Sequence, residues 1–269
     1  MESDVFMEII ESINNPKVKQ WYKLLNKKGR DKSGQYIIEG IKLIKEAIRF
    51  GQKIETIIVD HSKGLPEEFL ELYSSDKKKF FTVSKPVFEK LSETETPQGI
   101  MAIIKKQELT AKKLLTENNN FILLLDKIQD PGNLGTIIRS ADAAGVDAIV
   151  LGNGTVELYN PKVIRSAMGS VFHLPILSAD LDEIIAGLKQ KNVKIVGTSP
   201  YAKHDYFKID FSEKIAILVG NESKGLSKER QEQVDQMVKI PIVGQAESLN
   251  VAMATSIVLF ERVRQTILS

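Results

Sequence analysis

The second half of the chain alternates unbroken apolar runs with helix-type patterns, and this alternation limits the possible folds most. The run at residues 121–125, Phe-Ile-Leu-Leu-Leu, has no polar position, which is typical of a strand buried on both faces. Strands that alternate with helices form a parallel sheet with helices on both faces, and ligands bind beyond the C-terminal ends of such strands. The other predicted strands are 148–151, 193–197 and 215–219, and the predicted helices are 133–144, 162–170 and 181–190.

Residues 1–106 are interpreted as a smaller α/β domain with its own core. A polar stretch at 107–119 is interpreted as a linker. Residues 109–115 are compatible with a short helix within it. The second domain then covers residues 120–269. In the first domain the predicted helices are 8–30 (broken near Pro16), 41–50, 66–73 and 85–91, and the predicted strands are 36–40, 54–59, 80–83 and 100–104.

Composition excludes several classes of protein and of site. No stretch reaches the ~20 consecutive apolar residues that span a bilayer, and the acidic start of the chain does not resemble a secretion signal. The chain has no cysteine, so it forms no disulfide, and its three histidines, His61, His173 and His204, are scattered. We therefore expect a cytoplasmic protein with no membrane contact and no metal site.

The overall charge is nearly balanced, but residues 17–53 are strongly basic, with eleven Lys or Arg against three Asp or Glu. This stretch also holds the aromatic pair Trp21 and Tyr22. Basic and aromatic side chains together are typical of a surface that binds nucleic acid. Lys27, Lys28 and Arg30 are the predicted RNA contacts. The alternative interpretation is an ordinary solvated helix face.

A first polar cluster follows the strand at 121–125 and leads into the helix at 133–144. Asn133 is expected near the helix N-cap, where Gly132 and Gly135 permit another backbone to approach closely. Arg139 lies on the same helix. Either it binds an anionic ligand such as a phosphate, or it pairs with Asp126 or Asp142 for structural reasons.

A second cluster, residues 218–227, follows the strand at 215–219. Gly220 and Gly225 have the spacing of a phosphate-binding loop, but Leu226 stands where that motif needs Lys. The chain also has no G-x-G-x-x-G fingerprint, which argues against a nucleotide-dependent oxidoreductase. What remains is a glycine-lined loop with the carboxylate of Glu222. The alternative places Glu222 in the first turn of a helix.

A third cluster, residues 240–252, combines Ile240-Pro241 with Glu247-Ser248-Leu249-Asn250. Ser248 and Asn250 are able to bind a ligand or to cap the helix that follows. Residues 249–259 are too apolar to be expected on a surface. Gly220, Ile240 and Leu249 each lie at a predicted strand end or turn, where backbone groups are free to bind a small ligand.

The order and spacing of the three clusters resemble the motifs of the SpoU (TrmH) family of SPOUT RNA methyltransferases. The resemblance covers residues 118–269, with Ala252 where many members carry Ser. The segment Tyr36-Ile37-Ile38-Glu39-Gly40 resembles the ribosomal-protein-like substrate-binding domain common in this family. The motif residues are Asn133-x-Gly135-x-x-x-Arg139, Gly220-Asn221-Glu222-x-x-Gly225, Ile240-Pro241 and Ser248-Leu249-Asn250-Val251-Ala252.

The resemblance implies a parallel-sheet domain with a deep C-terminal trefoil knot, a homodimer formed through that domain, and S-adenosylmethionine as cofactor. It implies methyl transfer to a ribose 2′-oxygen, here of 23S ribosomal RNA, without a metal. The alternatives are a tRNA target or a non-catalytic RNA-binding protein. The implied cofactor-binding residues are Thr198, Gly220, Ile240 and Leu249, and the implied catalytic residues are Arg139, Asn133, Glu222, Asn250 and Ser248. Of these, Asn133 would orient Arg139 or the ribose.

Overall fold

The computed structural model describes residues 9–76, 79–116 and 119–267. The chain divides into two compact units, which are described separately. The first unit contains residues 1–107 together with 159–161, and the second contains residues 108–158 and 162–269. Residues 117 and 118 of the predicted linker lie outside the described residues. The rest of that segment includes helix α6 (Ala111–Thr116), whose Leu114 is buried in the core of the second unit.

The first unit is built on a mixed sheet. Among the described residues it has five strands in the order β1-β4-β3-β5-β2, and β5 runs antiparallel to both β2 and β3. The strands are β1 (Ile9–Ile10), β2 (Gln35–Glu39), β3 (Ile54–Asp60), β4 (Phe80–Val83) and β5 (Ile100–Lys105). The helices are α1 (Pro16–Lys23), α2 (Lys27–Ser33), α3 (Ile41–Arg49), α4 (Leu70–Ser75) and α5 (Lys85–Leu91), with a 3₁₀ turn, η1 (Glu67–Phe69).

The single helix predicted over residues 8–30 is wrong. Ile9 and Ile10 pair with β4 as an edge strand, and α1 begins at Pro16 instead of breaking there. Proline suits the first helical position because its missing N–H would have no partner inside the helix. The Asn26 side chain accepts a hydrogen bond from the Gly29 amide (2.9 Å) and so starts a second helix.

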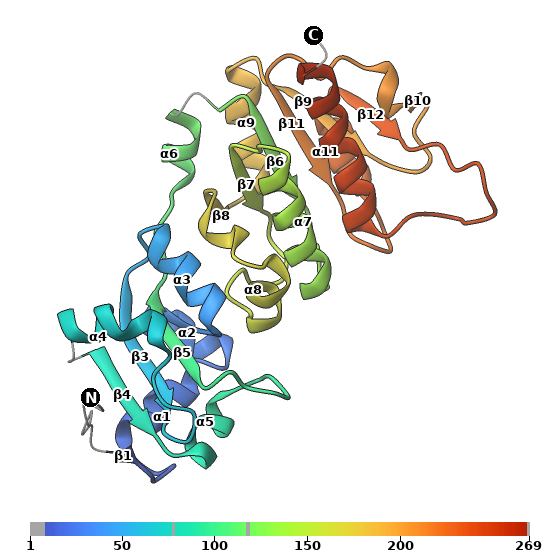
Figure 1. The fold of residues 1–269 in the computed structure, drawn as a ribbon. Coiled ribbons are helices and arrows are strands. Elements are labelled where there is room, and N and C mark those ends of the chain that lie inside the picture. Colours follow the sequence, from blue (N-terminus) through green and yellow to red (C-terminus); the bar gives the residue numbers. More distant parts are fainter. Residues whose placement is uncertain (1–8, 77–78, 117–118, 268–269) are drawn as a thin grey trace. The chain divides into compact units, whose positions relative to one another are not determined.

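The second unit contains the parallel sheet that the sequence predicted. Among the described residues it has seven strands, in the order β10-β12-β9-β11-β6-β7-β8, and every pairing is parallel (Figure 1). The predicted strands are β6 (Phe121–Leu125), β7 (Ala148–Leu151), β9 (Lys194–Thr198) and β11 (Ile215–Val219). Three strands that were not predicted complete the sheet, β8 (Ile176–Ser178), β10 (His204–Asp205) and β12 (Gln236–Lys239).

Helices cover both faces of this sheet. On one face, Ile122 and Leu124 of β6 share a core with α6 and with α9 (Leu181–Gln190). The helices α7 (Pro131–Ala143) and α11 (Val251–Ile267) lie side by side, joined by a 2.7 Å hydrogen bond between the hydroxyls of Ser140 and Ser256 (Figure 1). The remaining elements are α8 (Pro161–Ala167), α10 (Lys228–Gln233) and the 3₁₀ turns η3 (Ser170–Phe172) and η4 (Tyr206–Lys208). In the part of the chain that the structure describes, no helix has the length and apolar character needed to cross a membrane.

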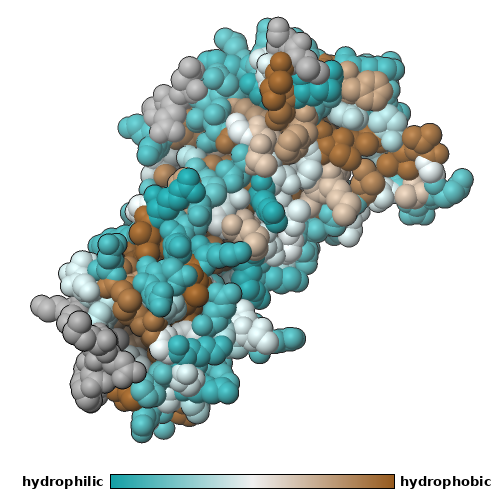
Figure 2. Space-filling view, viewed as in Figure 1, coloured by the Kyte–Doolittle hydropathy of each residue, from teal (hydrophilic) through white to brown (hydrophobic). Residues whose placement is uncertain are grey.

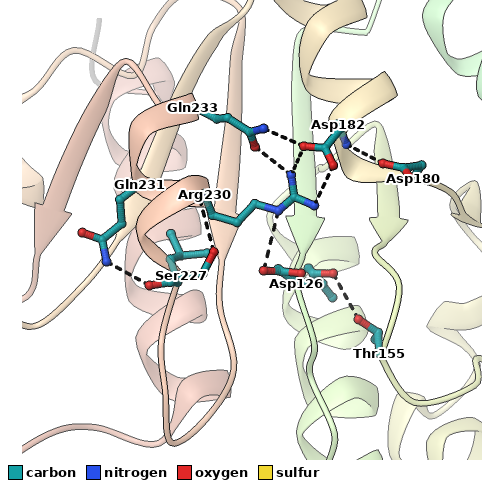
Figure 3. Close-up of polar contacts among 10 residues, drawn as sticks. Asp126, Thr155, Asp180, Asp182, Ser227, Arg230, Gln231 and Gln233 are labelled. Atoms are coloured by element: carbon teal, nitrogen blue, oxygen red, sulfur yellow. Dashed lines mark hydrogen bonds and ion pairs between the residues drawn. The ribbon is translucent and has the colours of Figure 1, made fainter.

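An ion-pair network holds α10 against the ends of two other elements (Figure 3). The Arg230 guanidinium contacts Asp182 in the first turn of α9 through Nη1 and Oδ1 (2.5 Å), and it contacts buried Asp126 through Nε and Oδ2 (3.8 Å). Gln231 on the same helix donates to the Leu226 carbonyl (2.8 Å). The network therefore fixes the segment between β11 and β12 relative to the end of β6.

We expect Arg230→Ala to lower the free energy of unfolding by about 3 kcal/mol, because it leaves the buried Asp126 carboxylate without its cation. Lys228→Ala, an exposed change on the same helix, is the control and should cost less than ~0.5 kcal/mol. Denaturant unfolding of both variants measures the difference. Equal losses would show that the network does not stabilise the second unit.

Candidate active site

The strands that carry the predicted site are neighbours in the sheet. β12, β9, β11 and β6 are adjacent, and their C-terminal ends lie at one edge because all of them are parallel. Thr198 ends β9, Gly220 follows β11 and Ile240 follows β12. The first polar cluster begins directly after β6. The sheet order therefore brings together loops that are up to about a hundred residues apart in the sequence.

A cavity of about 350 Å³ opens at this edge of the sheet. All four residues that were expected to bind the cofactor, Thr198, Gly220, Ile240 and Leu249, line it. Its volume is within the range of small-molecule sites. Glu222 and Ser248 also line it, together with apolar wall residues that include Val219, Val238 and Val258.

Glu222 joins the second cluster to the first. Its carboxylate accepts hydrogen bonds from the backbone amides of Gln129 (3.1 Å) and Asp130 (3.0 Å) and from the Asn133 side chain (3.3 Å). Burial would raise the pKa of the Glu222 carboxyl, but these hydrogen bonds outweigh burial and hold its pKa below the ordinary value. The alternative that placed Glu222 in a helical first turn is wrong, because the next helix begins only at Lys228.

Asn133 joins the third cluster to the other two. Its side-chain oxygen accepts a hydrogen bond from Asn250 Nδ2 (2.9 Å), while its nitrogen donates to Glu222. Asn250 in turn caps α11, because its Oδ1 accepts from the amide of Ala252 (2.9 Å). Asn133 lies in the first turn of α7, near the N-cap as expected; Asp130 is the cap itself and accepts a hydrogen bond from the Asn133 amide (2.8 Å).

Two residues to which the sequence analysis gave no role, Lys127 and the motif residue Asn221, shape this arrangement. Lys127 has a left-handed backbone (φ 60°), which turns the chain sharply as it leaves β6. Asn221 secures that turn by donating from Nδ2 to the Lys127 carbonyl (2.8 Å). The Asp130-Pro131 pair could have identified the true helix start, because an Asp cap followed by proline is a typical N-terminal signal.

Arg139 does not join the hydrogen-bonded cluster of its own chain, and the role of Asn133 in orienting Arg139 or the ribose stays a prediction. Six helical residues advance the chain by about 9 Å and turn it by about one and two-thirds turns, which places Arg139 on a different side of α7 from Asn133. Arg139 is exposed, and among the described residues it forms no hydrogen bond or ion pair.

Both acidic residues that could have paired with Arg139 for structural reasons have other partners. Asp126 lies against Arg230 (3.8 Å), and Asp142 lies against His173 (2.8 Å). Of the two interpretations of Arg139, the structural ion pair is therefore excluded. Its guanidinium is left available for an anionic ligand.

The prediction that Arg30 contacts RNA is contradicted. Arg30 is 3% exposed, and its guanidinium donates to the Leu24 carbonyl (2.9 Å), so it stabilises the turn between α1 and α2. Lys27 and Lys28 are exposed at the start of α2. No group of three or more His, Asp or Glu residues that could hold a metal ion occurs within residues 9–76, 79–116 and 119–267.

Comparison with known proteins identifies matches to both units. The model of the SpoU rRNA methylase family matches residues 120–260, and the model of an MRM3-like substrate binding domain matches residues 15–102. The 23S rRNA (guanosine(2553)-2′-O)-methyltransferase RlmP of Bacillus subtilis is 41% identical over 94% of this chain and 98% of its own length. A 23S rRNA (uridine(2479)-2′-O)-methyltransferase of Streptomyces viridochromogenes is 30% identical over 94% of this chain and 91% of its own.

Solved structures agree with these matches. The SpoU methyltransferase AviRb from Streptomyces viridochromogenes, in complex with AdoMet, is 30% identical with a TM-score of 0.85, over 94% of this chain and 98% of its own. An AdoMet-bound rRNA methyltransferase from Sinorhizobium meliloti is 32% identical with a TM-score of 0.86, over 96% of this chain and 98% of its own. The resemblance drawn from the three motifs is thus confirmed, and this chain belongs to the SpoU rRNA methylase family.

Proposed function

We propose that this protein methylates the 2′-oxygen of one ribose in 23S ribosomal RNA. Its family membership makes it an S-adenosylmethionine-dependent RNA 2′-O-methyltransferase. The observation that carries the proposal is the shared cavity, because residues from three separate loops line it and the Glu222–Asn133–Asn250 cluster lies beside it. Since the 41% identical relative is named for a guanosine, a guanosine is the first nucleotide to examine.

The cavity suits a nucleoside-containing cofactor. Apolar side chains of Val219, Val238 and Ile240 offer a surface for an adenine ring, and the loop ends of β9, β11 and β12 offer free backbone groups. S-adenosylmethionine supplies a sulfonium-activated methyl group. Glu222 places a carboxylate on the cavity wall, and Ser248 places a hydroxyl there.

In the proposed reaction the ribose 2′-oxygen forms a bond to the methyl carbon, the carbon–sulfur bond breaks, and the hydroxyl proton passes to solvent. Most of the rate gain comes from holding the oxygen in line with the methyl group. Arginine is a poor base because its pKa exceeds 12. We therefore assign Arg139 to holding the neighbouring phosphate and stabilising the developing alkoxide.

A homodimer is part of the proposal. Met253, Phe260 and Ile267 are 62%, 46% and 75% exposed. Their seven-residue spacing aligns them on one stripe of α11. Figure 2 shows hydrophobic residues gathered over this helix and over the loop after β12. A second copy of the chain would bury this stripe.

Arg139 lies next to the stripe, because Ser140, the following residue on α7, contacts α11 through Ser256. We therefore propose that Arg139 contributes to the cavity of the partner protomer.

The remaining expectations are proposals of the same kind. Family membership supports the proposal that the C-terminal segment of the second unit is threaded as a trefoil knot. We assign RNA binding to the first unit, which the substrate-binding-domain model matches. We also propose a cytoplasmic location, which a ribosomal RNA substrate supports.

Incubation of the wild-type protein with labelled S-adenosylmethionine and unmodified 23S transcript should label one ribose 2′-oxygen, and nuclease mapping would locate it. Arg139→Ala should keep cofactor affinity and reduce the rate by about 10²-fold, the loss typical when one transition-state donor is removed. Label only on tRNA would reassign the substrate. Unchanged turnover of Arg139→Ala would remove Arg139 from the mechanism.

Reversing the charges of Lys27 and Lys28 to Glu should weaken binding of the same transcript and flatten its salt dependence. The slope of log K against log salt should fall by ~0.7 for each lost single-strand phosphate contact. Filter binding across a salt series measures this slope. Lys112 and Lys191, two exposed lysines of the second unit, are the matched controls. If both double variants lose the same slope, α2 carries no specific RNA contact.

Met253→Glu combined with Phe260→Glu should convert a dimer into monomers, since each change would bury an uncompensated charge in the interface. Light scattering after size exclusion measures the mass. The monomer should also lose methyl transfer, because Arg139 would no longer reach a partner's cavity. Gln190→Glu on α9 is the control for added charge. A wild-type protein that is itself monomeric would contradict the dimer.

A further inference from the structure

The turn after β9 carries an aromatic side chain, Tyr201, at the cavity. This side chain is not part of the Glu222–Asn133–Asn250 cluster. Tyr201 lines the cavity and is 94% exposed, so its ring packs against almost nothing in its own chain. Exposed aromatic rings at the opening of a site are stacking surfaces, because every nucleobase presents a π-face. Exposure to this degree makes Tyr201 different from the apolar walls Val219 and Val238, which are buried.

The backbone that carries Tyr201 is held firmly. The Ser199 amide donates to the Val238 carbonyl (3.0 Å), which ties the turn to β12. The Ser199 hydroxyl accepts from the Tyr201 amide (3.2 Å), and the Ser199 carbonyl accepts from the Ala202 amide (3.2 Å). Pro200 restricts the same turn. The ring is therefore presented by an ordered support, which reduces the entropy lost when it binds a partner.

A cation lies beside the ring in the sequence. Ala202 is buried, while Lys203 on its other side is exposed. Among the described residues Lys203 forms no hydrogen bond or ion pair, so its ammonium group is free to contact a phosphate. An aromatic face and an unpaired cation two residues apart match one nucleotide, with its base and its backbone charge.

We propose that Tyr201 stacks on a base of the RNA substrate near the target ribose and that Lys203 contacts the adjoining phosphate. This inference rests on the proposed function, because the ribose must enter the cavity from solvent to reach the methyl donor. A side chain exposed at the cavity meets the entering RNA, whereas the buried walls enclose the cofactor. Tyr201 is then a substrate-binding residue of the methyltransferase unit, separate from the basic face of the first unit.

The test measures the KM for unmodified 23S transcript and, by calorimetry, the Kd for S-adenosylmethionine. Tyr201→Ala should raise the KM for RNA about tenfold, as loss of one stacking contact predicts, and leave the Kd for the cofactor unchanged. Tyr201→Phe keeps the ring and should behave as wild type. Lys203→Gln should reduce the slope of log K for transcript binding against log salt by ~0.7. Phe207→Ala, an exposed aromatic that does not line the cavity, is the matched control.

An unchanged KM for RNA in Tyr201→Ala would overturn the inference, and a weakened cofactor Kd in its place would make Tyr201 a wall of the cofactor site. An equal effect of Phe207→Ala would also overturn it. If the wild-type protein methylates no RNA, the proposed function fails separately. Binding of the same transcript then decides the role of Tyr201, where a tenfold loss supports stacking and equal affinity contradicts it.

Discussion

The candidate site depends on the Glu222 carboxylate. The first amides of a helix and the turn before it lack partners within the helix, and a negative charge placed there satisfies them and interacts favourably with the helix dipole. Glu222 fills this role for the amides of Gln129 and Asp130, although it comes from a loop more than ninety residues later. Its third partner, Asn133, extends the connection to Asn250 and so to the start of α11.

This carboxylate also explains why the loops need unusual backbones. For Glu222 to reach the start of α7, the loop after β11 must fold back on itself, and the Asn221–Gly225 bridge does this. A Cβ on Gly220 would lie 2.4 Å from the Gly225 backbone, so only glycine fits there. On the other side, Lys127 adopts its left-handed conformation to deliver the two amides. The glycines of the second motif thus serve loop closure, and no phosphate is needed to explain them.

The sequence predicted the parts of the fold that burial dictates. A strand with helices on both faces must be apolar throughout, so β6, β7 and β11 were readable as uninterrupted runs. The run that predicted β9 is interrupted by Lys194. The edge strands β8 and β10 and the polar β12 were not readable, because short or half-exposed strands leave no continuous apolar signal. Arg30 failed for a related reason. A cation inside a basic run looks solvated, and only the fold reveals that the Leu24 carbonyl holds it in the interior.

The site divides in the same way. Motif spacing placed Gly220, Ile240 and Leu249 at strand ends and turns, and the family resemblance added Thr198. The order of parallel strands brings all four to one cavity. The hydrogen-bond partners of side chains could not be predicted. The side-chain amide of Asn133 has one acceptor and one donor group, and their partners come from loops far away in the sequence. The expectation that residues 249–259 are buried is wrong within a single chain, since Met253 is 62% exposed. The reason for that expectation, that so many apolar side chains favour burial, still applies. An apolar stripe beside an unpaired Arg139 is what a site completed by a second protomer would leave on a single chain.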